Sequence, residues 1–234
     1  MTSVRRALAL AFLERYLTVA LALGSNMLLA RLLTPHEIGV YSVSLAVIGI
    51  AQVLREFGIG NYLIQEQQLS DDHLRTAFGI SLLLGGALFV VVFAAAPLAA
   101  GFYGEPTMTQ TLRIAALNFL VLPFCTVRLA LLRRAMAFKA LLYVTVAATV
   151  VSQVATVALA WGGFGPNSMA IGSVLLNVAM SLGGYMAHQD KRVLAPSLRL
   201  WRPLLRFGGQ SALTNVITSV SIDVNELVVA RVLG

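Results

Sequence analysis

The sequence predicts an all-α membrane protein, a polytopic bundle of about seven transmembrane helices. Of its 234 residues, 58% are hydrophobic and only 12% are charged, whereas soluble domains average about 45–50% apolar and about 25% charged residues. Mean hydropathy is +0.83. A soluble domain of this size cannot bury so much apolar surface. The composition therefore excludes a soluble globular domain, a disordered chain and a disulfide-stapled secreted scaffold.

Seven apolar stretches are long enough to span a bilayer, because a spanning helix needs about 20 mainly apolar residues. They cover residues 12–33, 38–64, 77–102, 112–132, 141–161, 169–187 and 207–233. The third stretch carries no charge, and the seventh is the most polar. Turn residues separate the stretches, as in Gly104-Glu105-Pro106. We expect a six-helix lobe over residues 1–190, a basic linker over 191–206, and the first helix of a second lobe over 207–234.

Lysine and arginine residues alternate between successive loops and predict the orientation of the bundle. Three lie on one side, at Arg31, Arg113 and Arg231. Eleven lie on the other side: Arg5, Arg6, Arg75, Arg133, Arg134, Lys139, Lys191, Arg192, Arg199, Arg202 and Arg206. Because the cytoplasmic loops of membrane proteins carry the excess of positive charge, we expect a cytoplasmic N-terminus. The net charge of +7 then reflects topology and contact with anionic lipid, and requires no nucleic-acid partner.

The sequence contains no signal of an enzyme. Its single Cys125 cannot form an intramolecular disulfide, and its three histidines are scattered without metal-ligand spacing. Phosphate-binding and hydrolase motifs are absent from the sequence. We therefore expect neither catalysis nor a bound metal or cofactor.

Four charged residues stand inside the first two apolar stretches, Glu14 and Arg15 in the first, Arg55 and Glu56 in the second. Charges at membrane depth usually face a partner or a water-filled cavity. Antiparallel neighbouring helices would place both pairs at similar depth, so Glu14 with Arg55 and Arg15 with Glu56 are expected partners. Two interpretations stay open: a charged mouth of a substrate cavity, or a structural cluster of salt bridges.

The first stretch also carries a polar strip. At 100° per residue, Glu14 shares a face with Thr18 and Ser25, and Arg15 shares an adjoining face with Asn26.

In the seventh stretch six polar residues fall within an arc of about 100°. They are Gln210, Ser211, Thr214, Thr218, Ser221 and Asn225. Asp223 lies on the face opposite this arc, and Glu226 lies between the arc and Asp223. We therefore expect other helices to cover this helix on more than one face.

The seventh stretch repeats the first. A shift of 200 residues places Ala30-Arg31-Leu32-Leu33 over Ala230-Arg231-Val232-Leu233, and Thr18 over Thr218. The second copy follows six stretches, an even number, so both copies would enter the membrane from the same side. This arrangement is typical of transporters with two parallel repeats around a site near the midplane.

Three segments of the chain carry a family resemblance: Met27 to Pro35 with Ile38-Gly39-Val40-Tyr41, Phe57 to Gln65 with Leu74 to Phe78, and Arg133-Arg134 with Phe138. They resemble, in this order, the first loop, the loop after the second helix and the next cytoplasmic loop of the polysaccharide and O-antigen flippases, which belong to the multidrug/oligosaccharidyl-lipid/polysaccharide exporter superfamily. The resemblance covers essentially the whole chain. The chain departs from the family in two respects: members usually have at least twelve spans, and many carry an acidic residue where Asn225 stands.

The resemblance implies a flippase in the cell inner membrane that moves undecaprenyl-diphosphate-linked oligosaccharide to the outer leaflet for polysaccharide or lipopolysaccharide biosynthesis. Arg15, Arg55 and Arg128 would then bind the diphosphate as charge-assisted hydrogen bonds. Sugar hydroxyls would meet the polar faces of the first and seventh helices, at Thr18, Ser25, Asn26, Thr214, Thr218, Ser221 and Asn225.

Two alternatives to this function remain. One is a cation-coupled multidrug exporter of the same superfamily, which the arginines of the first two stretches disfavour. The other is a truncated membrane protein without transport activity. Since the seventh helix opens a second lobe, we expect residues 1–234 alone not to flip substrate, and to self-associate or to require a second lobe as partner.

Overall fold

The protein is helical throughout the part of the chain that its computed structural model describes, residues 2–55, 59–66, 69–187, 196–197 and 199–202. The described helices are α1 (Thr2–Leu32), α2 (Pro35–Arg55), α3 (Ile59–Gln65), α4 (Asp71–Tyr103), α5 (Pro106–Arg134), α6 (Phe138–Trp161) and α7 (Pro166–Ala187). These same residues contain no strand. The predicted all-α class is confirmed.

Five of the described helices are long and apolar enough to cross a membrane: Leu8–Leu32 within α1, and α4, α5, α6 and α7 over their full lengths. The protein is thus a polytopic membrane bundle. The predicted second stretch, 38–64, contains α2 and the short α3, and residues 56–58 between them lie outside the described residues. The seventh expected span lies outside the described residues.

Local sequence signals set where the helices begin and end. At the start of α2, the Thr34 backbone N–H donates to Glu37 Oε2 (2.8 Å) and the Glu37 N–H donates to Thr34 Oγ1 (3.3 Å). This reciprocal capping, followed by proline in the first turn, fixes the N-terminus of α2. Gly104 ends α4 in the left-handed conformation at φ 70°, which glycine adopts without steric strain.

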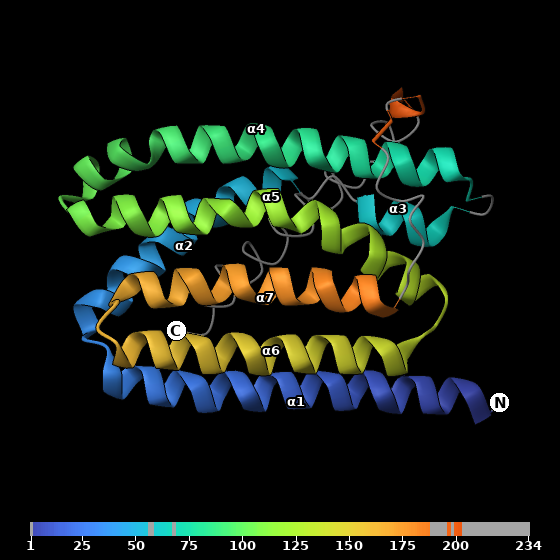
Figure 1. The fold of residues 1–234 in the computed structure, drawn as a ribbon, viewed down its shortest axis with the longest axis horizontal. Coiled ribbons are helices and arrows are strands. Elements are labelled where there is room, and N and C mark those ends of the chain that lie inside the picture. Colours follow the sequence, from blue (N-terminus) through green and yellow to red (C-terminus); the bar gives the residue numbers. More distant parts are fainter. Residues whose placement is uncertain (1, 56–58, 67–68, 188–195, 198, 203–234) are drawn as a thin grey trace, which may run out of the picture.

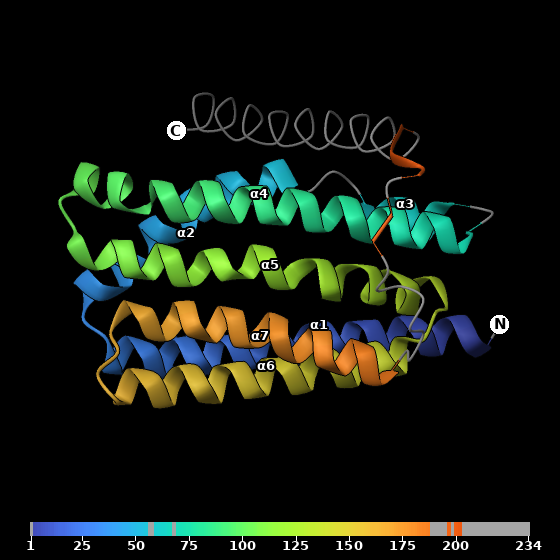
Figure 2. The same cartoon turned by 45° about the horizontal axis from the view of Figure 1, so that its top comes forward.

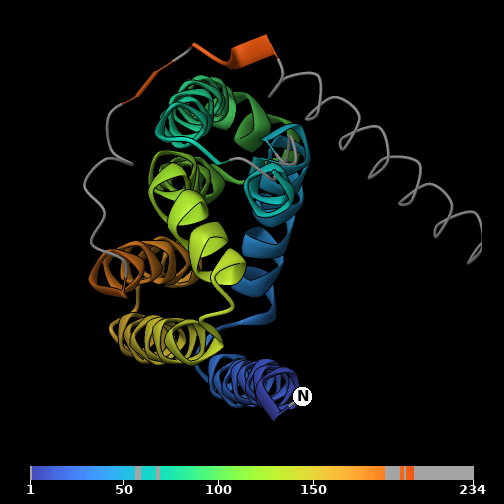
Figure 3. The same cartoon turned by 90° about the vertical axis from the view of Figure 1, so that its right-hand side faces the viewer.

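The long helices form a stack. From one end of the stack to the other, the neighbouring helices are α4, α5, α7, α6 and α1, while α2 crosses one side and packs on α5, α4 and α7 (Figure 3). Phe119 and Leu112 of α5 are fully buried, and Val40 and Ile48 of α2 join the same core. At the end of the stack away from α4 lies α1, which packs chiefly along α6.

The two ends of the bundle differ in charge. The N-termini of α1, α4 and α6 lie at the same end as the C-termini of α5 and α7 (Figures 1 and 2). We call this end the basic end. Its terminal turns carry Arg75 of α4, Arg133 and Arg134 of α5 and Lys139 of α6, and Arg199 lies there beside Asp72. The opposite end holds the α1–α2, α4–α5 and α6–α7 connections, with Arg31 in the last turn of α1 and Arg113 in the second turn of α5.

Residues of the expected linker dock on the first turns of α4 at the basic end. The Ser197 N–H donates to the Arg75 carbonyl (3.1 Å), and the Leu200 N–H donates to Thr76 Oγ1 (3.4 Å). Gly79 allows this approach, because a β carbon there would overlap the backbone of Ser197. The segment that leads out of the first six stretches is therefore held against α4.

Arg134 fixes the short helix α3 to the end of α5. Its Nη1 donates to the carbonyls of Leu63 (3.0 Å), Ile64 (3.4 Å) and Glu66. These are orphan carbonyls at the C-terminus of α3, where a cation also complements the helix dipole.

We expect Arg134→Ala to lower the unfolding free energy by about 1.5–3 kcal/mol, the range for hydrogen bonds to charged groups. The measurement is the melting temperature of the detergent-solubilised protein. Arg133→Ala is the matched control, because Arg133 is the neighbouring arginine and its side chain is exposed. Equal melting temperatures for the two variants would contradict the capping role.

Candidate functional site

Arg128 is a buried cation between α5 and α7. The residue is only 3% exposed, and its guanidinium carbon lies 4.7 Å from the centroid of the Tyr185 ring on α7. Its Nε and Nη2 atoms are buried and have no hydrogen-bond partner among the described residues. A desolvated cation–π contact contributes about 2 kcal/mol, which does not replace the hydrogen bonds that buried charged donors require. The guanidinium thus keeps donors free for an anionic ligand.

Small residues on α7 make room for this side chain. A β carbon added at Gly184 would lie 3.4 Å from Arg128 Cβ, and one added at Gly183 would lie 2.9 Å from Val144 Cγ1 on α6. The glycine pair therefore lets α7 approach α5 and α6 closely. This approach places the Tyr185 ring against the guanidinium.

A polar seam joins α5 and α7 and runs from the opposite end of the bundle toward Arg128. Thr111 Oγ1 donates to Asn167 Oδ1 (2.9 Å). Asn118 Nδ2 donates to Ser173 Oγ (2.8 Å), and Asn177 Nδ2 donates to Asn118 Oδ1 (2.7 Å). We call these five residues the α5–α7 seam. In an apolar environment such bonds contribute about 0.6–2 kcal/mol each and fix the pairing of the two helices.

The structure does not bring α1 and α2 together as expected. α1 lies along α6, and α2 crosses to the other side of the stack (Figure 3). The predicted Glu14–Arg55 ion pair is wrong: the part of the chain that the structure describes contains no such contact. The physical reason is that α2 buries its apolar face, with Val40 and Ile48, in the core around α5.

The other predicted residues of α1 differ in burial. Arg15 and Asn26 are exposed, and Thr18 Oγ1 donates to the carbonyl of Glu14 in its own helix (2.9 Å). Ser25 is buried on the side toward α6. These residues do not line a site with Arg128, which lies in another layer of the stack.

Arg55 lies in the last turn of α2, close enough to Cys125 on α5 for its charge to act on that side chain. Arg128 follows Cys125 by one helical turn, so both arginines border the same part of α5. Other predicted site residues lie outside the described residues: Glu56, Thr214, Thr218, Ser221 and Asn225.

Comparison with known proteins identifies the family. A sequence profile described as "Polysaccharide biosynthesis protein" matches residues 28–234. The chain belongs to this family. It is 30% identical over 220 residues to the lipopolysaccharide biosynthesis protein WzxC of Escherichia coli K12, which covers 92% of this chain and 44% of that protein.

Two further relatives support the assignment. The teichuronic acid biosynthesis protein TuaB of Bacillus subtilis is 33% identical over 73 residues, which cover 31% of this chain and 15% of that protein. An uncharacterised membrane protein in the cps region of Klebsiella pneumoniae is 24% identical over 231 residues, which cover 92% of this chain and 45% of that protein. No solved structure matches the chain. The chain spans less than half the length of WzxC and of the Klebsiella protein.

Sequence reasoning missed the α5–α7 seam of this polysaccharide biosynthesis protein. A signal was present, because Thr111 and Asn118 are seven residues apart and Ser173 and Asn177 are four apart. Both spacings place polar side chains on one face of a helix. Polar residues at these spacings within apolar stretches predict an interhelical hydrogen-bonded contact, although they do not say which helix supplies the partner.

Proposed function

We propose that this protein is a transporter, not an enzyme, and forms part of a flippase for undecaprenyl-diphosphate-linked oligosaccharide in the cell inner membrane. Membership of the polysaccharide biosynthesis family supports the substrate class. The observation that carries the proposal is the buried Arg128, whose Nε and Nη2 atoms have no hydrogen-bond partner among the described residues.

Guanidinium chemistry suits the diphosphate of the lipid carrier. Arginine presents a planar set of donors that bind phosphate oxygens in bidentate, charge-assisted hydrogen bonds. In the present arrangement the Tyr185 ring covers Arg128. Binding therefore requires α7 to move away from α5, so that the diphosphate replaces the ring as the partner of the cation.

The α5–α7 seam offers a second type of contact. Its hydroxyl and amide groups already exchange hydrogen bonds across the two helices. When the helices separate, the same groups can form hydrogen bonds with sugar hydroxyls instead. The total number of hydrogen bonds then changes little. Arg128 and the seam would then bind the two polar parts of one substrate.

The remaining expected residues divide between this site and α1. Arg55, which Glu56 follows in the sequence, joins Arg128 near α5, and contacts with sugar come from Thr214, Thr218, Ser221 and Asn225. The residues of α1 lie in another layer of the stack than Arg128 and are not part of the proposed site: Glu14, Arg15, Thr18, Ser25 and Asn26. Residues 1–190 form one lobe, 191–206 the linker, and 207–234 the start of a second lobe, so that two lobes rock around the site.

We further propose that the basic end and the N-terminus are cytoplasmic, following the distribution of positive charge. Single cysteines replacing Arg133 and Phe164, both exposed, should react with an impermeant thiol reagent from opposite sides of the membrane. Cys125→Ser provides the background without a native thiol. Reaction of both positions from the same side would contradict the topology.

The function is tested by depleting the protein in its native cell and extracting lipids labelled in their sugar. Because assembly of the oligosaccharide on its carrier continues while transfer stops, we expect undecaprenyl-diphosphate-linked oligosaccharide to accumulate several-fold. An unchanged level would contradict the proposed function.

A further inference from the structure

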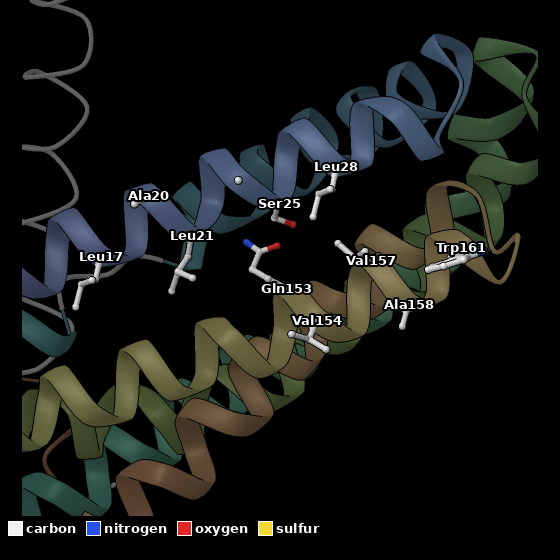
Figure 4. A pocket seen from close by; sticks show the side chains of 11 residues that line it. Leu17, Ala20, Leu21, Ser25, Leu28, Gln153, Val154, Val157, Ala158 and Trp161 are labelled. Atoms are coloured by element: carbon white, nitrogen blue, oxygen red, sulfur yellow. The ribbon is translucent and has the colours of Figure 1, made fainter.

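A cavity of about 620 Å³ lies between α1 and α6, away from Arg128 and the seam. Its lining is apolar except for Ser25 and Gln153, and includes Leu21 and Gly24 of α1 with Val157 and Trp161 of α6 (Figure 4). None of the lining residues is charged. The cavity therefore suits an uncharged, mainly hydrocarbon ligand.

Two polar side chains line this cavity. Ser25 is 5% exposed, and its hydroxyl makes no hydrogen bond to any described residue. The amide of Gln153 extends from α6 into the space between the helices, on the side of Ser25 (Figure 4). Buried hydroxyl groups normally find partners, so we expect the occupant of the cavity to offer an acceptor beside Ser25.

The depth of this pair restricts the ligand. Gln153 precedes Trp161 by eight residues, a rise of about 12 Å along a helix. Trp161 is 81% exposed at the end of α6, and exposed tryptophans at helix ends are typical of the membrane interface. In a hydrocarbon layer of about 30 Å, Ser25 and Gln153 then lie near the midplane, beyond the reach of phospholipid ester groups.

We propose that this cavity, called the groove below, binds the polyisoprenoid chain of the lipid carrier, an inference that rests on the proposed function. A polyisoprenoid has a double bond in every repeat, and its π electrons accept weak hydrogen bonds from hydroxyl and amide groups. A saturated acyl chain offers no acceptor at this depth. The cavity equals about twenty water volumes, enough for several isoprene units, while the diphosphate binds at Arg128.

The experiment uses a geranylgeranyl phosphate that carries a diazirine in its chain, photoactivated in native membranes that contain the protein. We expect label in the peptides around Leu21 and Val157. Gly24→Leu should reduce this labelling at least tenfold, because a β carbon at Gly24 meets nothing within 4 Å and a larger side chain fills the groove. Gly86→Leu on α4 is the matched control, since a β carbon there is equally unobstructed.

Ala158→Leu fills the groove from α6 and keeps the test valid if Gly24→Leu does not accumulate. Unlabelled undecaprenyl phosphate should remove the label, and the saturated dipalmitoyl phosphatidylglycerol should not. Undiminished labelling of both filled variants, or equal competition by the phospholipid, would overturn the inference. Label near Tyr185 without label in the groove would overturn binding of the polyisoprenoid chain in the groove and leave the proposed function standing. No labelling anywhere in the protein would contradict the proposed function as well.

Discussion

Replacing Arg128 with alanine in the chromosomal gene should slow transfer of the lipid-linked oligosaccharide by roughly 10- to 150-fold. This range corresponds to the loss of about 1.5–3 kcal/mol for hydrogen bonds to a charged group. Arg128→Lys should retain part of the rate, because lysine keeps the charge but not the bidentate geometry. The rate is measured as the appearance of labelled oligosaccharide at the outer face.

Stability separates this loss of transfer from misfolding. Within the part of the chain that the structure describes, Arg128 has buried N–H groups without a partner and no ion pair, so its removal leaves no buried counter-charge there and relieves a desolvation penalty. We expect the melting temperature of Arg128→Ala to stay unchanged or to rise. Arg133→Ala, a change at an exposed arginine of the same helix, should transfer at nearly the normal rate. Near-normal transfer by Arg128→Ala would contradict the role of this residue.

Gly172→Ala should be strongly destabilising. A β carbon at this position would overlap Thr156 Oγ1 on α6, and the Gly172 carbonyl also accepts a hydrogen bond from Ser152 Oγ (2.7 Å). Forcing an extra carbon into such a contact typically costs about 1–3 kcal/mol. The measurements are the yield and the melting temperature of the solubilised protein.

Gly86→Ala is the control for this substitution, because an added β carbon there meets nothing within 4 Å. The second change Thr156→Ala removes the overlapping hydroxyl and should recover part of the loss, which a double-mutant cycle would quantify. Equal melting temperatures of Gly172→Ala and Gly86→Ala would show that α6 and α7 are not packed as described.

Helix positions could be predicted from the sequence because their signals are local. Apolar length, Pro106 at the start of α5 and Gly104 at the end of α4 each act within a few residues. The partner of α1 could not be predicted in this way. Consecutive helices often pack together, but the buried face of α2 fits the core around α5 better than it fits α1.

In the candidate site, too, local features could be predicted from the sequence and contacts between helices could not. An arginine inside an apolar stretch predicts a functional residue, and the resemblance to the flippases gave Arg128 an expected role in binding the diphosphate. Its contact with Tyr185 could not be predicted, because it depends on how close Gly184 allows α7 to approach. The unpartnered Ser25 hydroxyl likewise follows from the packing of α1 on α6 and not from its spacing along α1.

The most direct test of the central claim is the leaflet in which undecaprenyl-diphosphate-linked oligosaccharide resides. The measurement is the fraction of labelled intermediate that an impermeant glycosidase releases from intact spheroplasts, with and without the protein. The account predicts that the sugar is accessible when the protein is present, and that without it the sugar becomes accessible only after the membrane is opened. Equal accessibility in intact spheroplasts of both kinds would contradict it.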